Sequence, residues 1–251
     1  MKEQLRKHAM ALYDFCEYPA VRYKLLFSIL DTPYEDELLP ALREQFLKSD
    51  IVEEMSELQD EYGGWGRFRS KDYSVRAKIP TSSTGINRCL YIGLTIHDRD
   101  LLFLAKEYLL SLLDGTSPEV LFEKNERANP WQTAEVRHLG GEASIRGHFW
   151  DKTPDQLPEE FQNRMMRRWF HTFNYINQFR GSGLYLKDAV VWLIDQAGPD
   201  GLWDWGPQVN DPWGYFGYFS CNRHYKHNRV VDGTMEILNF LKKYVDHNPC
   251  K

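Results

Sequence analysis

Apolar residues recur at helical spacing along most of the chain. In the stretch DIVEEMSELQ, residues 50–59, four apolar residues fall on one face of a helix: Ile51, Val52, Met55 and Leu58. Asp50 and Glu53 have the spacing of a capping box, which predicts Asp50 as the N-cap of this helix. At the start of the preceding helix, Thr32, Pro33 and Glu35 predict another capping box, with Thr32 as the N-cap and Pro33 as the first helical residue.

The same reasoning predicts helices over most of the remaining chain. Further helical patterns occupy residues 101–113, 116–124, 151–176, 184–196 and 230–245. Alternating strand patterns are scarce, and the best of them, KDYSVRAKI at residues 71–79, is short. The pattern therefore predicts a single all-α domain over residues 1–251.

One phrase occurs twice in this helical pattern. QDEYGGWGRF begins at Gln59, and QAGPDGLWDWG begins at Gln196. Each follows an apolar helix and leads into a loop rich in glycine and aromatic residues. An Asn-Arg pair, at residues 87–88 or 222–223, then stands near the start of another helix. This similarity predicts a helical repeat at about residues 51–113 and 184–244.

The chemistry of the phrase suits a helix junction. A glutamine at a helix end can bond free backbone groups, and a glycine allows the positive φ that ends a helix. A tryptophan then covers the helix pair with a large apolar ring system whose N–H needs a partner. We therefore interpret Gln59, Trp65 and Gln196 as structural residues.

The spacing of Gln59, Gly63 and Trp65 resembles the QxxxGxW repeat of squalene–hopene cyclases and related proteins with prenyltransferase repeats. Gln196, Gly201 and Trp203 are similar, with one extra residue after the glutamine. The resemblance implies an α/α toroid, in which helical hairpins surround a central cavity. It also implies a small-molecule enzyme or binding protein whose ligand is an isoprenoid or another apolar compound.

Composition and charge argue against several other classes of protein. A net charge of -5 and a pI near 5.9 argue against a nucleic-acid-binding surface. No apolar stretch is long enough to cross a membrane, and the charged N-terminus lacks the apolar segment of a signal peptide, so we expect a cytoplasmic protein. The four cysteines are then expected to be reduced thiols.

The acidic motifs of the resembled enzymes are missing. The chain contains neither DxDD nor DDxxD, and Asp98 or Asp100 in HDRD is more simply explained as the N-cap of the next helix. Cys221, His224 and His227 are spaced by three, and Asp211 or Asp232 could complete a zinc site with them. Exposed histidines and a core cysteine explain this spacing as well, so we predict no bound metal and no cofactor.

The strongest candidate for a ligand site is the aromatic stretch at residues 201–219, GLWDWGPQVNDPWGYFGYF. Aromatic faces can line a pocket, and a carboxylate among them can become a proton donor. We expect Trp205, Trp213 and Tyr215 to contact a ligand, and Asp204 or Asp211 to act as the catalytic carboxylate. Three arginines are candidates to pair with these carboxylates or with an anionic ligand: Arg67, Arg88 and Arg223.

The sequence also fits two other functions. Tryptophan platforms beside paired carboxylates also suit a carbohydrate-active or glycan-binding protein. A non-catalytic scaffold, with side chains filling the barrel, would explain the missing acidic and metal motifs.

Overall fold

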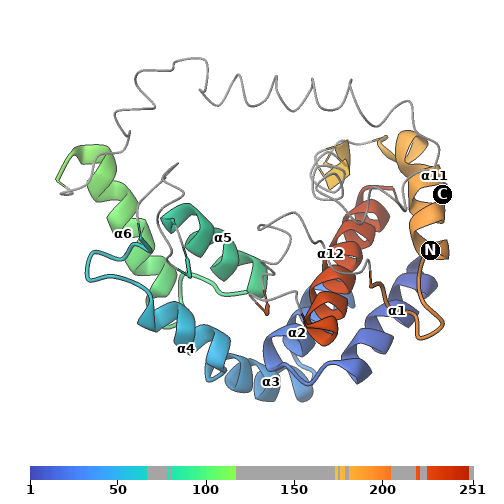
Figure 1. Cartoon of the computed structure of the whole chain (residues 1–251), viewed down its shortest axis with the longest axis horizontal. Helices are drawn as coiled ribbons and strands as arrows, with labels where there is room; N and C mark the ends of the chain where they lie inside the picture. Colours follow the sequence, from blue (N-terminus) through green and yellow to red (C-terminus); the bar gives the residue numbers. More distant parts are fainter. Residues whose placement is uncertain are drawn as a thin grey trace. The chain divides into compact units, whose positions relative to one another are not determined.

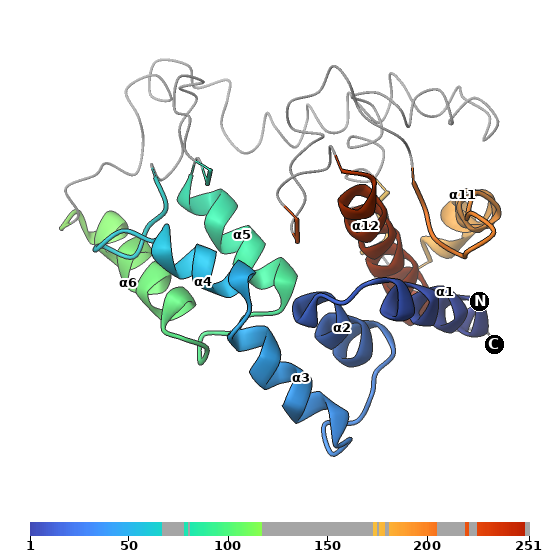
Figure 2. The ribbon, with the colours of Figure 1, turned by 60° about the horizontal axis from the view of Figure 1, so that its bottom comes forward.

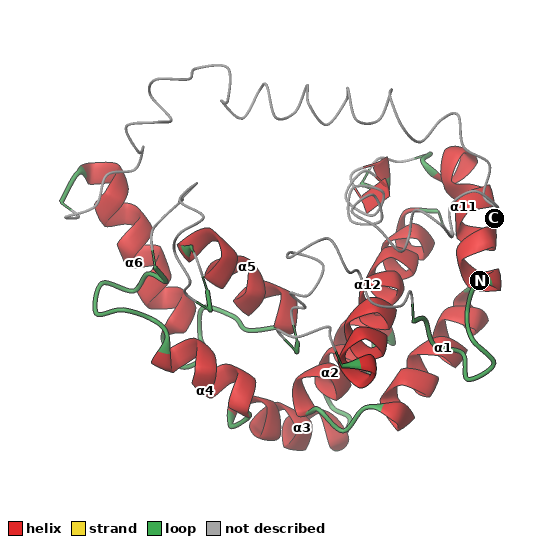
Figure 3. Cartoon of the chain, viewed as in Figure 1, coloured by secondary structure: helices red, strands yellow, loops and turns green. Residues whose placement is uncertain are grey.

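The computed structural model describes residues 1–66, 78–79, 81–116, 173–174, 176–178, 181–204, 219–220 and 225–248. Within these ranges the chain consists of helices and connecting loops, with no β-strand, which confirms the all-α prediction (Figure 3). None of the helices in these ranges combines the length and apolar character that a membrane span needs. The chain divides into two compact units, residues 1–35 with 138–251 and residues 36–137.

The first unit is built around the C-terminal helix α12, Lys226–His247. The N-terminal helix α1, Lys2–Phe15, packs along α12, and α11, Gly183–Asp195, contacts it as well (Figure 1). The core side chains of α12 are almost completely buried, among them Val231, Met235, Leu238 and Phe240.

A short helical segment connects α1 to the rest of this unit. It consists of α2, Pro19–Lys24, and the π-helix η1, Leu25–Ile29. The Nε of Arg22 donates to the carbonyl of Cys16 at 2.8 Å and so holds the end of α1 against α2. After η1, the Nζ of Lys242 lies 2.9 Å from a carboxylate oxygen of Asp31, which fastens this segment to α12.

The second unit contains four described helices. These are α3, Leu38–Leu47, α4, Asp50–Glu57, α5, Ser82–Ile92, and α6, Leu101–Asp114. Helices α5 and α6 pack side by side (Figures 1 and 2). Val52 and Met55 of α4 are fully buried, as their helical spacing predicts.

Two predicted helix starts are wrong. Helix α3 begins at Leu38 rather than near Pro33, because Asp31 has a left-handed φ of 51° and the chain turns until Glu37. A carboxylate oxygen of Asp36 accepts from the backbone N–H of Leu38 at 2.9 Å, so Asp36 supplies the polar contact expected of Thr32. The N-cap of α4 is Ser49 rather than Asp50, because Ser49 has the extended backbone of a cap residue.

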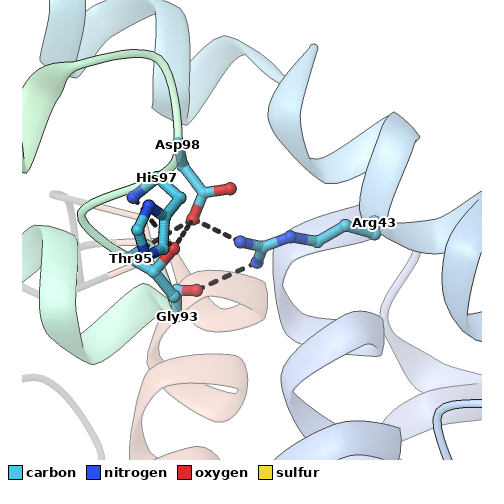
Figure 4. Close-up of polar contacts among 5 residues, drawn as sticks. All are labelled: Arg43, Gly93, Thr95, His97 and Asp98. Atoms are coloured by element: carbon cyan, nitrogen blue, oxygen red, sulfur yellow. Dashed lines mark hydrogen bonds and ion pairs between the residues drawn. The ribbon is translucent and has the colours of Figure 1, made fainter.

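Of Asp98 and Asp100, the two predicted candidates for the N-cap of the next helix, only Asp100 has that position. The N-cap position of α6 is taken by Asp100, whose side chain makes no capping hydrogen bond. Asp98 instead closes the α5–α6 loop: it accepts from the N–H and the hydroxyl of Thr95, both at 2.6 Å, and pairs with Arg43 of α3 (Figure 4). Burial raises the pKa of Asp98, but the hydrogen bonds from Thr95 and Arg43 outweigh burial and hold this pKa below its usual value.

Several predicted elements lie outside the described residues. They are the helix at residues 116–124 beyond Thr116, most of the helix at residues 151–176, and the strand pattern at residues 71–79 apart from Lys78 and Ile79.

Candidate functional site

The two tryptophans of the repeated phrase lie in matching environments. Trp65 and Trp203 are 0% and 1% exposed. The indole Nε1 of Trp65 donates to the carbonyl of Met55 at 2.9 Å, and that of Trp203 donates to the carbonyl of Leu193 at 2.8 Å. In both cases the acceptor lies ten residues earlier, in the preceding helix. Each indole therefore fills the space beside a helix and satisfies its polar atom there.

Each tryptophan is also tied to the following helix. The backbone N–H of Trp65 donates to the hydroxyl of Ser82 in α5 at 2.9 Å, and the N–H of Trp203 donates to the hydroxyl of Thr234 in α12 at 3.0 Å. Both hydroxyl-bearing residues are fully buried. We call residues 58–66 the first junction and residues 196–204 the second junction. Trp65 and Trp203 are thus buried at equivalent positions of the two junctions, which agrees with the interpretation of Trp65 as a structural residue.

The turns inside the two junctions match as well. The N–H of Gly63 donates to the carbonyl of Asp60 at 3.0 Å, and the N–H of Gly201 donates to the carbonyl of Gly198 at 2.8 Å. Gly63 and Gly201 have φ values of 93° and 80°, in the left-handed region that glycine adopts without strain. Every pair of equivalent residues in the turns is separated by 138 positions, as Trp65 is from Trp203.

The glutamines of the two phrases, however, differ in role. Gln59 donates through Nε2 to the carbonyl of Gly63 at 2.8 Å and to the carbonyl of Leu101 in α6 at 2.9 Å. Because of the extra residue in the second phrase, the position equivalent to Gln59 is Ala197, and Gln196 is exposed. The equivalent carbonyl, that of Gly201, bonds instead to Nδ1 of the buried His8 in α1, at 2.7 Å.

His8 therefore replaces Gln59, and it comes from the opposite end of the chain. Its ring also lies against Trp203, with 4.7 Å between the ring centroids. In the first junction the glycine turn contacts α6, and in the second it contacts α1. The buried positions of the two helices match at a shift of 96 residues: Leu5 with Leu101, Ala9 with Ala105 and Leu12 with Tyr108.

Each junction thus belongs to a module of three helices. The first module contains α4, the first junction, α5 and α6. The second module contains α11, the second junction, α12 and, as its third helix, the N-terminal helix α1. The predicted repeats, at about residues 51–113 and 184–244, cover all three helices of the first module but only the first two of the second. The contribution of α1 was missed, because a single buried histidine in an N-terminal helix gives no signal that identifies its partner.

The modules differ in the length of one helix. Ser82 and Thr234 are equivalent, but α5 begins at Ser82 whereas α12 begins at Lys226, eight residues before Thr234. This extension also shows that the two Asn-Arg pairs are not equivalent, since Asn87 and Arg88 lie inside α5 and residues 222–223 precede α12.

Two residues in the extension of α12, Arg229 and Asp232, bond to described residues on either side of positions 205–218. Arg229 binds both carboxylate oxygens of Asp204, with its Nε at 3.1 Å and an Nη at 3.3 Å. The buried carboxylate of Asp232 accepts from the N–H of Phe219 at 3.0 Å and from the hydroxyl of Ser220. Asp204 and Phe219, the described residues on either side of positions 205–218, are therefore bonded to α12 at points about one helical turn apart.

The structure describes only two of the predicted site residues, Asp204 and Arg88. Asp204 lies in the ion pair with Arg229, and the fully buried Arg88 lies 3.5 Å from a carboxylate oxygen of Glu54. The remaining candidates lie outside the described residues: Asp211, Trp205, Trp213, Tyr215, Arg67 and Arg223. Arg229 and Asp232 were not predicted as partners of the aromatic stretch, since the sequence does not show which turn of a helix faces a loop.

The candidate metal ligands are only partly described. His227 is exposed and stacks on Phe15 with 4.9 Å between ring centroids, and Asp232 is occupied by Phe219 and Ser220. Cys221, His224 and Asp211 lie outside the described residues. Within the described ranges, no group of three or more histidine, cysteine or acidic side chains has a geometry that suits a metal ion.

The two cysteines that the structure describes are free, buried thiols. Burial raises the pKa of Cys16 to about 11 and that of Cys89 to about 12. A thiol with so high a pKa carries little thiolate at neutral pH and is a poor nucleophile.

Comparisons of this chain with protein-family models, with curated proteins and with solved structures found no match.

Proposed function

We propose that the chain is a protein of the prenyltransferase and squalene-cyclase type, with an α/α toroid built from junction modules, and that it binds a small apolar ligand such as an isoprenoid. Two features support the repeat architecture. The junctions share their tryptophan, glycine and hydroxyl contacts, and the second module obtains its third helix from the N-terminus. A ring of modules requires such an exchange, because its last module must meet the first part of the chain.

We place the ligand at residues 205–218, and the observation that carries this placement is the extension of α12. The first module holds its junction without such an extension. In the second module the extra turns provide Arg229 and Asp232, which fix both ends of the aromatic stretch. Binding and catalytic residues lie disproportionately in connections that a rigid scaffold positions.

Within this site the two candidate carboxylates have different roles. Asp204 is bound by the guanidinium of Arg229 on both oxygens, a geometry that fixes orientation. We therefore assign Asp204 to holding the loop and Asp211 to the ligand, where it would serve as the proton donor if the protein is an enzyme. Trp205, Trp213 and Tyr215 supply the apolar contact surface.

Fluorescence titration tests the proposed ligand. Farnesol is expected to quench tryptophan fluorescence saturably, and Trp213→Ala is expected to weaken its binding by about tenfold, equivalent to about 1.4 kcal/mol, with unchanged cooperative unfolding. Trp192→Phe is the matched control, because it also removes one tryptophan but lies on α11, and it should leave the affinity unchanged.

The alternatives give different results in the same titration. Quenching by a cello-oligosaccharide but not by farnesol would replace the isoprenoid proposal with a glycan-binding function. Loss of cooperative unfolding in Trp213→Ala, without quenching by either compound, would show that the aromatic stretch is packing in a scaffold.

A further inference from the structure

Helix α6 has more exposed apolar surface than its position in the module requires. Phe103, Leu110 and Leu113 are 44%, 45% and 68% exposed. Together with Lys106 they have the spacing i, i+3, i+7 and i+10, so they form one stripe along the helix. We call these four residues and the adjacent Glu107 the α6 face. A helix that is apolar on its outer side as well as its inner side is typically buried on both.

Helix α1 provides an internal comparison, because it has the same place in the second module. At the shift of 96 residues, Phe103 corresponds to Lys7, Leu110 to Asp14 and Leu113 to Glu17. All three are charged and exposed; Lys7 and Asp14 lie on α1, and Glu17 follows the end of that helix. The module geometry therefore does not require apolar residues at these positions, and contiguous exposed apolar groups are a mark of an interaction surface.

We propose that the α6 face is the contact surface of a homodimer, in which α6 packs antiparallel against α6 of a second copy. The charges at the centre of the face favour this partner. Lys106 and Glu107 are adjacent, 52% and 51% exposed, and paired with each other at 3.3 Å. Around a two-fold axis between them, Lys106 of each copy faces Glu107 of the other.

The same axis also pairs two of the apolar residues. Phe103 lies three residues before Lys106 and Leu110 lies three residues after Glu107, so Phe103 of one copy faces Leu110 of the other. A two-fold contact uses the same surface on both subunits and must be self-complementary in this way. The Nζ of Lys106 also lies 5.6 Å from the ring centroid of Phe103, which keeps the cation at the apolar stripe.

Sedimentation equilibrium of the full chain tests the homodimer. The wild-type chain is expected to show a reversible, concentration-dependent monomer–dimer equilibrium. Phe103→Lys with Leu110→Asp gives α6 the residues that α1 carries at the equivalent positions, and should weaken dimerisation by at least about tenfold. Lys7→Glu is the matched control, since it reverses an exposed charge on α1, and it should not change the equilibrium.

A charge exchange gives the sharper test. Lys106→Glu alone places like charges opposite each other and is expected to weaken the dimer, as is Glu107→Lys alone. Combining Lys106→Glu with Glu107→Lys restores the opposite charges across the axis and should restore the affinity. A monomer at all concentrations, or a dimer that these variants leave unchanged, would overturn the proposal. A monomeric wild-type chain that Phe103→Lys with Leu110→Asp unfolds would also overturn the proposal. That result would mean that other residues of the same chain cover the α6 face.

Discussion

Replacing Trp203 by alanine is expected to lower the free energy of unfolding by about 3–5 kcal/mol, as for other large-to-small substitutions in a protein core. The indole is 1% exposed, and its removal would leave a cavity between α11, α12 and α1. The carbonyl of Leu193 would also lose its bond to Nε1. Urea unfolding followed by far-ultraviolet circular dichroism measures the change.

Two further variants separate the causes of this loss. Trp203→Phe keeps much of the apolar volume but removes the indole N–H, so we expect a smaller loss of about 1–3 kcal/mol. Trp65→Ala removes the equivalent residue of the first junction and should cost as much as Trp203→Ala, within about 1 kcal/mol. A loss below about 0.5 kcal/mol for Trp203→Ala, the size of an ordinary surface substitution, would contradict the assignment of Trp203 to the core.

Substituting Gly63 by alanine is expected to destabilise the protein by about 2–5 kcal/mol, the combined cost of a left-handed residue and of overpacking. A Cβ at Gly63 would lie 2.4 Å from the carbonyl oxygen of Leu104, so the backbone of α6 would have to move. Gly201 has a similar φ, but a Cβ there would meet only ordinary contacts, at 3.4 Å to His8 and 3.5 Å to Ala11.

Gly201→Ala is therefore the control, and we expect it to cost only the conformational term of about 1–2 kcal/mol. The difference between the two variants, measured by urea unfolding, reports how closely α6 approaches the first junction. Equal losses would show that the contact between Gly63 and Leu104 is looser than the structure indicates.

The helical periodicity and the tryptophan spacing predicted the two junctions correctly. This succeeded because the contacts of a junction are local: each indole bonds to a carbonyl ten residues earlier. The role of Gln196 could not be predicted in the same way. One extra residue moves the glutamine out of its position, and the carbonyl of Gly201 then bonds to His8, which lies 193 residues away in the sequence.

Capping signatures were less reliable than periodicity. Thr32, Pro33 and Glu35 have a suitable spacing, but the left-handed Asp31 and the turn at Asp36 delay the helix to Leu38. Asp98 and Asp100 were both candidates for the cap of α6, and Asp100 has the N-cap position, whereas Arg43 and Thr95 draw the carboxylate of Asp98 into the α5–α6 loop. A long-range arginine of this kind cannot be identified from spacing.

For the proposed ligand site, the sequence draws attention to the aromatic stretch but does not show that Arg229 and Asp232 bond to Asp204 and Phe219. Arg229 and Asp232 are three residues apart and therefore fall about one turn apart on α12. Their function depends on the second module having a longer helix than the first, and the sequence repeat alone does not set the point at which α12 begins.

Hydrogen exchange of the indole N–H groups, followed by NMR, tests the equivalence of the two junctions most directly. The account predicts that the Nε1 protons of Trp65 and Trp203 are both strongly protected, because each is buried and bonded to a helix carbonyl, and that both exchange only with global unfolding. An indole of either residue that exchanges as fast as an exposed tryptophan would contradict the account.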